Sequence, residues 1–96
     1  MNINANSQLA LSDEVLFQDL AGEAAVLHLK TEEYFTLNET GTLAVNLLSE
    51  CESVREMCDR FLEEYEIEPT QLEQDLLNYL DELVSKDIVI VKNSEV

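Results

Sequence analysis

The 96-residue chain has two glycines, one proline, two cysteines and no tryptophan. With so few glycines it has no glycine-rich phosphate loop, and it also contains no GxSxG, HExxH or EF-hand pattern. Cys51 and Cys58 are too few for a disulfide scaffold and lack the CxxC spacing of a redox or zinc site, so we expect reduced thiols. These absences predict a protein that is not an enzyme and has no catalytic residue, metal or cofactor.

Basic residues are also scarce, since five Lys and Arg stand against 21 Asp and Glu and leave a net charge of -16. Such a charge repels phosphate backbones and anionic lipids, so we expect neither a nucleic acid nor a membrane as partner. The longest apolar runs, Ala24 to Leu27 and Ile88 to Val91, are far too short to span a bilayer. No Lys or Arg precedes Lys30, which argues against a targeting segment, and we expect a cytoplasmic protein.

The apolar pattern changes at Asn38, from a period near two before it to spacings of three and four after it. Val15 and Phe17 alternate, Ala21-Gly22 provides a turn, and Ala25, Leu27 and Leu29 alternate again. A second turn over residues 30–33 leads to the aromatic and β-branched segment 34–37. This half predicts a meander of three antiparallel strands.

Three helices are predicted after Asn38. Asn38 is a suitable N-cap for a helix over about 39–49, and Ser53 begins a capping box for a helix over about 54–65. For the third helix, either Pro69 occupies the first position or Thr70 is the cap, and an apolar stripe then extends to Val84. Ile88 to Val91 is typical of a short closing strand.

The predicted fold is therefore α+β and winged-helix-like, a three-stranded antiparallel sheet followed by three helices. Residues 1–12 are expected to be a flexible N-terminal segment, residues 13–91 the domain, and residues 92–96 a flexible tail. A winged helix often binds DNA, but the third helix here is acidic, and its single basic residue, Lys86, lies at its end. We therefore do not expect this helix to bind DNA.

Few side chains suggest chemistry. His28 lies mid-strand on the face opposite Leu27 and Leu29, where a structural role is more common than a catalytic one. A zinc site from His28, Cys51, Cys58 and a carboxylate is conceivable but has little support. An acyl carrier is disfavoured, because no serine stands in an Asp-Ser-Leu or Asp-Ser-Met motif.

Three stretches resemble a known family. They are the segment from Val15 to Ala24, the Tyr-Phe-x-Leu-Asn-x-x-Gly run at 34–41, and the Leu-x-x-Asp-Leu-x-x-x-Leu-x-x-Leu run at 72–83. Together they make the chain similar to PqqD-like proteins, the coenzyme PQQ synthesis protein D family or RiPP recognition elements. Two departures stand out: Ala44 and Val45 replace a bulky residue that is often Trp, and Asp87 replaces a common Gly. The first suggests a repacked core, and Asp tolerates a left-handed backbone better than most residues.

The resemblance implies a function. Members bind the leader segment of a ribosomally made precursor peptide as an added strand on the third strand, beside the third helix, and deliver it to an enzyme. The implied enzyme is a modifying enzyme, such as a radical SAM enzyme, or a leader protease, and the chain would be a monomer or homodimer. The implied peptide-binding residues are the strand residues Glu33, Tyr34, Phe35, Thr36 and Leu37 and the helix residues Leu72, Asp75, Leu76 and Tyr79.

Plain core packing is an equally good explanation of Leu72 and Leu76. The competing function is an acidic protein-interaction subunit or regulator that acts through its helices.

Overall fold

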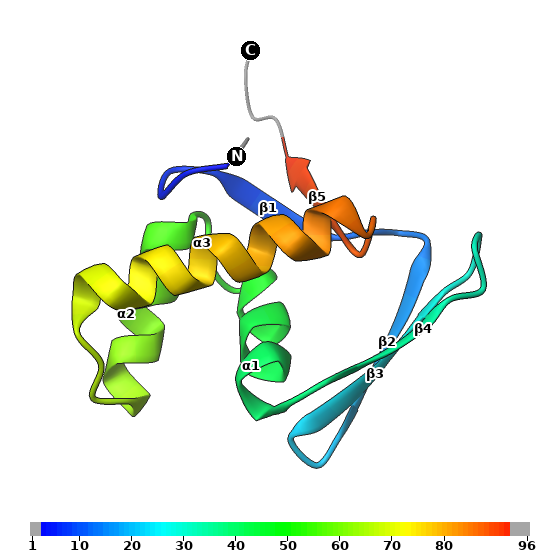
Figure 1. Ribbon diagram of the computed structural model, residues 1–96, viewed down its shortest axis with the longest axis horizontal. Helices are drawn as coiled ribbons and strands as arrows, with labels where there is room; N and C mark the ends of the chain where they lie inside the picture. The colour runs from blue at the N-terminus through cyan, green and yellow to red at the C-terminus, as the bar shows by residue number, and fades with distance from the viewer. Residues whose placement is uncertain (1–2, 93–96) are drawn as a thin grey trace.

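The computed structural model describes residues 3–92 (Figure 1). Its elements follow in the order β1 (Gln8–Leu11), β2 (Val15–Leu20), β3 (Glu23–His28), β4 (Tyr34–Leu37), α1 (Glu39–Leu48), α2 (Val54–Glu64), α3 (Pro69–Ser85) and β5 (Val89–Lys92). The α+β architecture is confirmed, with a three-stranded meander that precedes three helices. No helix in the described part of the chain is long and apolar enough to cross a membrane.

The meander forms an antiparallel sheet in the order β2-β3-β4, so β3 is central and β4 is an edge strand. The predicted Ala21-Gly22 turn joins β2 to β3, and both residues have positive φ, 59° and 94°. This combination is the geometry of a type I′ hairpin turn, whose twist matches that of the flanking strands. Figure 1 shows the sheet leaning away from the helices and joined to them where β4 leads into α1.

The sheet buries one face of β3, and the sequence left the choice of face open. Ala24, Val26 and His28 point into the core, whereas Ala25 and Leu27 are half-buried and Leu29 is exposed. Both sets alternate and both are largely apolar, so periodicity alone could not distinguish them. The His28 ring is held in place through Nδ1, which accepts hydrogen bonds from the backbone N–H groups of Lys30 and Thr31 in the adjoining turn.

Each helix begins at a recognisable cap. The side chains of Asn38 and Ser53 accept hydrogen bonds from backbone N–H groups of α1 and α2, as predicted. At α3, Pro69 takes the first helical position and the cap is the Glu68 carboxylate, not Thr70. A proline there costs no hydrogen bond, because the first N–H groups of a helix have no partner within it.

The N-terminal segment is a correction to the expected domain boundary. Residues 8–11, which we expected to be flexible, form β1 and pair antiparallel with β5, with Leu9 opposite Val91. Ile3 and Leu9 are only 4% and 5% exposed, because they complete the same core as the helices. Residues 1, 2 and 93–96 lie outside the described part, while Lys92 belongs to β5.

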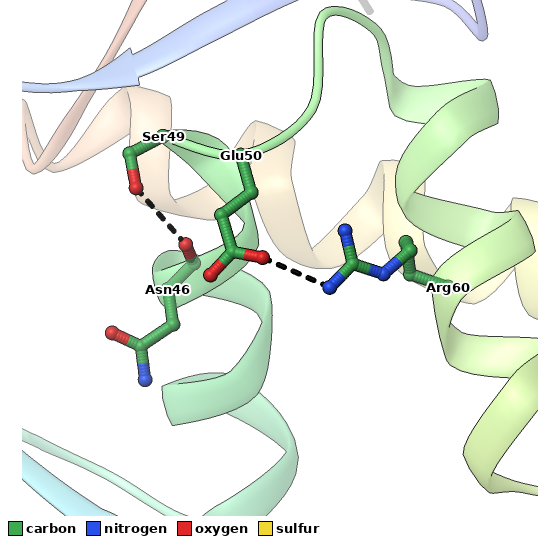
Figure 2. A network of polar contacts seen from close by, with 4 residues as sticks. All are labelled: Asn46, Ser49, Glu50 and Arg60. Atoms are coloured by element: carbon green, nitrogen blue, oxygen red, sulfur yellow. Dashed lines mark hydrogen bonds and ion pairs between the residues drawn. The ribbon is translucent and has the colours of Figure 1, made fainter.

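The turns that follow α3 and α1 show further local features. Asp87 follows α3 with a φ of 61°, which confirms the left-handed conformation for which we expected aspartate to be tolerated. Between α1 and α2, the Ser49 hydroxyl donates to the Asn46 carbonyl, and Arg60 forms an ion pair with Glu50 at 2.9 Å (Figure 2). Both charged groups are about half exposed, so this pair adds at most about 1 kcal/mol.

The burial of Leu9 leads to a first prediction. Leu9→Ala removes buried methyl groups from the core and should lower the free energy of unfolding by about 2–5 kcal/mol. Gln8→Ala, at the half-buried neighbouring position, should change it by less than about 0.5 kcal/mol. Urea unfolding followed by circular dichroism measures both, and equal midpoints for Leu9→Ala and the wild type would show that β1 does not belong to the core.

Candidate functional site

Strand β4 has an open edge, and its register identifies the backbone groups that face outward. The His28 N–H donates to the Glu33 carbonyl at 2.8 Å, so this pair is hydrogen-bonded across β3 and β4. Hydrogen-bonded pairs alternate in antiparallel sheets, and the backbone groups of Phe35 and Leu37 therefore also face β3. The N–H and C=O groups of Tyr34 and Thr36 consequently point away from the sheet and are available to a further strand.

The side chains of β4 alternate between the two faces of the sheet. Tyr34 is 65% exposed on the outer face, and Leu37 is buried in the core. Phe35 is half-buried on the inner face, where the Lys86 ammonium at the end of α3 lies 5.4 Å from its ring centroid. This cation–π contact places the start of β4 close to the C-terminal end of α3.

The predicted residues of α3 lie together around one small pocket. Leu72, Asp75, Leu76 and Tyr79 line a cavity of about 210 Å³ between α1 and α3. The structure adds five residues that the sequence did not indicate as part of the site, namely Asn38, Thr40, Gly41, Ala44 and Phe61. Ala44 stands where the resemblance led us to expect a bulky residue, and its small side chain leaves this space open.

The structure does not bring the two groups of predicted residues together in one cavity. Asn38 directly follows β4 and also lines the α1–α3 pocket, so the open edge leads to the pocket. Tyr34, Thr36 and Leu37 line a second hollow at the sheet, to which Asn38 also contributes, whereas Glu33 and Phe35 line neither of these two cavities. Leu72 and Leu76 are buried, and they pack in the core as well as facing the pocket.

The pocket depends on a contact between Gly41 and Tyr79. The Asn38 side chain accepts the Gly41 N–H at 2.8 Å, which turns the chain from β4 into α1. A Cβ atom at position 41 would overlap the Tyr79 hydroxyl, so the glycine makes room for the tyrosine. Burial, followed by the nearby Glu82 carboxylate, raises the pKa of Tyr79, and the phenol therefore remains a hydrogen-bond donor at neutral pH. The Asn-x-x-Gly spacing was the available sequence signal for this corner.

Outside this pocket, the described residues contain few groups suited to catalysis or metal binding. A larger cleft of about 740 Å³ lies between β1 and α1 and has a mixed lining that includes Phe17, Asn46 and Cys51. Burial raises the pKa of both cysteine thiols, so neither is an activated thiolate. Within residues 3–92, no three His, Cys, Asp or Glu side chains gather to hold a metal ion, and the buried His28 Nε2 has no hydrogen-bond partner.

The glycine contact gives a second prediction. Alanine normally stabilises a helix relative to glycine, but Gly41→Ala should cost about 1–3 kcal/mol here, because the new methyl group displaces Tyr79. In a Tyr79→Ala background the same substitution should be neutral or stabilising. Chemical unfolding of the four proteins in this cycle measures the coupling. Additive effects would show that the two residues do not contact each other in the folded protein.

Comparison with known proteins identifies relatives of this fold. The structure of TbiB1 in complex with the TbiA(beta) leader peptide has a TM-score of 0.79, with 29% identity over 91% of this chain and 99% of that one. A lasso peptide synthetase B1 complexed with its leader peptide has a TM-score of 0.78 and 24% identity, over 86% of this chain and 98% of that one. At 24% identity, the similarity to this second structure supports the fold only. No curated protein matches the chain.

The family profile of coenzyme PQQ synthesis protein D (PqqD) matches residues 23–89. The match runs from the start of β3 to the start of β5 and includes both β4 and α3. It therefore contains the open edge, the Asn38–Gly41 corner and the whole pocket. Since the match covers well over half of the sequence, this chain belongs to the PqqD family.

Proposed function

We propose that this protein binds the leader segment of a ribosomally synthesised precursor peptide as an added antiparallel strand on β4. The observation that carries the proposal is the open edge of β4, where the backbone groups of Tyr34 and Thr36 point outward and the residue that follows the strand, Asn38, lines the α1–α3 pocket. Backbone hydrogen bonds to such an edge supply affinity, and pockets for alternate side chains supply selectivity.

The comparisons support this proposal. TbiB1, 29% identical and alike over nearly the whole chain, was solved with a leader peptide bound. In our chain, an added strand next to β4 would send every second side chain to the inner side, toward α3. The predicted binding residues Glu33 to Leu37 would provide the edge, and Leu72, Asp75, Leu76 and Tyr79 would provide the wall.

The proposed role is delivery rather than catalysis. The bound leader would hold its precursor for a separate modifying enzyme, such as a radical SAM enzyme, or for a leader protease. Binding itself would need no cofactor, because strand addition uses only backbone hydrogen bonds and side-chain packing. We expect such a module to bind with a dissociation constant of about 1 μM or lower, which corresponds to a binding free energy of about 8 kcal/mol or more in favour of the complex.

The register gives a sharp test of strand addition. Thr36→Pro removes an outward N–H while leaving the ladder to β3 intact, so leader affinity should fall at least about tenfold in a folded protein. Phe35→Pro removes an N–H that faces β3 and should unfold the sheet. Calorimetry with the leader of a precursor encoded beside the chain, together with circular dichroism, measures both effects.

Thr36→Ala is the matched control, since it shortens the side chain but keeps the N–H, and it should bind the leader nearly as well as the wild type. Full affinity in a folded Thr36→Pro variant would place the peptide elsewhere. Amide shifts confined to the helices during a titration would instead favour the acidic interaction subunit.

Electrostatics gives a further prediction. The net charge of -16, with Glu33 and Asp75 at the proposed groove, should accelerate association with a basic leader or enzyme. Raising the salt concentration from about 50 mM to about 500 mM should slow association several-fold and change dissociation little, because salt screens long-range attraction more than close contacts. Stopped-flow kinetics measures both rates. A salt-independent association rate for both partners would mean that the acidic excess serves solubility.

A further inference from the structure

The outer face of the sheet, which points away from the helices, carries a row of apolar side chains. Leu16 pairs with Leu27, and Leu27 pairs with Tyr34, so these three side chains lie side by side across the sheet. Leu16 and Leu20 on β2 are 57% and 55% exposed, and Tyr34 is more exposed still. Within residues 3–92 no element packs over this row. Gln18 lies between Leu16 and Leu20 on the same face of β2 and opposite Ala25, so the apolar surface has one polar position within it. An exposed apolar surface with polar surroundings is typical of an interaction site.

The same face is hollowed at one end. A depression of about 430 Å³ is lined by Leu20, Ala25, Tyr34 and Thr36, whose side chains share the outer face by strand alternation. Glu23, Ala24, Leu37 and Asn38 complete its lining. A flat apolar surface offers little shape selectivity. A hollow of this size can accept a protruding side chain of a partner protein, and fully buried anchors of this kind carry most of the energy of an interface.

Acidic residues surround the apolar row. Strand alternation places Glu14 and Glu23 on the outer face at its two ends, and Glu32 and Glu33 are exposed in the turn between β3 and β4. Lys30 is the only Lys or Arg between residues 13 and 37. A second copy of the chain would bring like charges against this rim, which opposes self-association. A surface with Lys and Arg around an apolar centre is complementary to it.

We infer that this outer face, centred on Leu16, Leu20 and Tyr34, is the docking surface for the enzyme that acts on the precursor. The inference rests on the proposed function of β4. A leader strand on β4 would continue the sheet, and its outward side chains would extend the row formed by Leu16, Leu27 and Tyr34. The enzyme would thus contact the protein and the leader together. The matching surface of the enzyme would be apolar at its centre and ringed by basic side chains.

The test uses the full chain, its leader peptide and the purified processing enzyme encoded beside it. The double variant Leu16→Gln/Leu20→Gln should weaken binding of the enzyme at least about tenfold, because both side chains leave the apolar surface, while leader affinity stays within about twofold. The control Ile90→Gln/Val91→Gln changes two similarly exposed aliphatic residues on β5, 43% and 44% exposed, and should leave binding of the enzyme unchanged. Circular dichroism verifies the fold of each variant.

Several results would overturn the inference. Undiminished enzyme binding by the outer-face variant, or no enzyme binding by a wild-type chain that binds its leader, would each do so and would leave the proposed function standing. A wild-type dimer in sedimentation that the outer-face variant dissociates would assign the surface to a second copy. Absence of leader binding by the wild type would instead reject the proposed function, and the enzyme would then be measured against the leader-free chain.

Discussion

The corner between β4 and α1 is the constraint on which the proposed site depends. Asn38 caps α1 through the Gly41 N–H, and this cap ends the edge strand where the helix begins. Gly41 lacks the Cβ atom that would displace the Tyr79 hydroxyl, so the Tyr79 side chain of α3 can reach the first turn of α1. One short segment therefore fixes the end of the open edge and one wall of the pocket.

An open edge strand endangers a small protein, because its unpaired backbone groups can pair with another copy of the chain. β4 is only four residues long, and the turn before it carries Glu32 and Glu33. The net charge of -16 keeps identical chains apart. Repulsion between identical chains explains how the protein can keep both an open edge and an apolar outer face. In the proposed function, the same charge also speeds association with a basic partner.

Small local features of the sequence predicted much of the fold. The Ala21-Gly22 turn and the caps Asn38 and Ser53 are where the sequence placed them, and Pro69 at the start of α3 is one of the two alternatives that it offered. Each depends on backbone geometry within a few residues. The N-terminal segment was different. Leu9 is buried because β1 pairs with β5, roughly 80 residues later in the chain, and packs against the helical core, and no local pattern encodes either partner.

The sequence by itself determined the class of fold, the order of the strands and helices from Val15 onward, and the family resemblance. These follow from periodicity, turn chemistry and side-chain spacing, all of which act over short distances along the chain. Only the tertiary structure decided that Val26 and His28 face the core, that Tyr34 and Thr36 turn their backbone groups outward, and that Ala44 leaves a pocket beside Tyr79. Each of these depends on register or on packing between distant segments, where a shift of one residue would reverse the face of a strand.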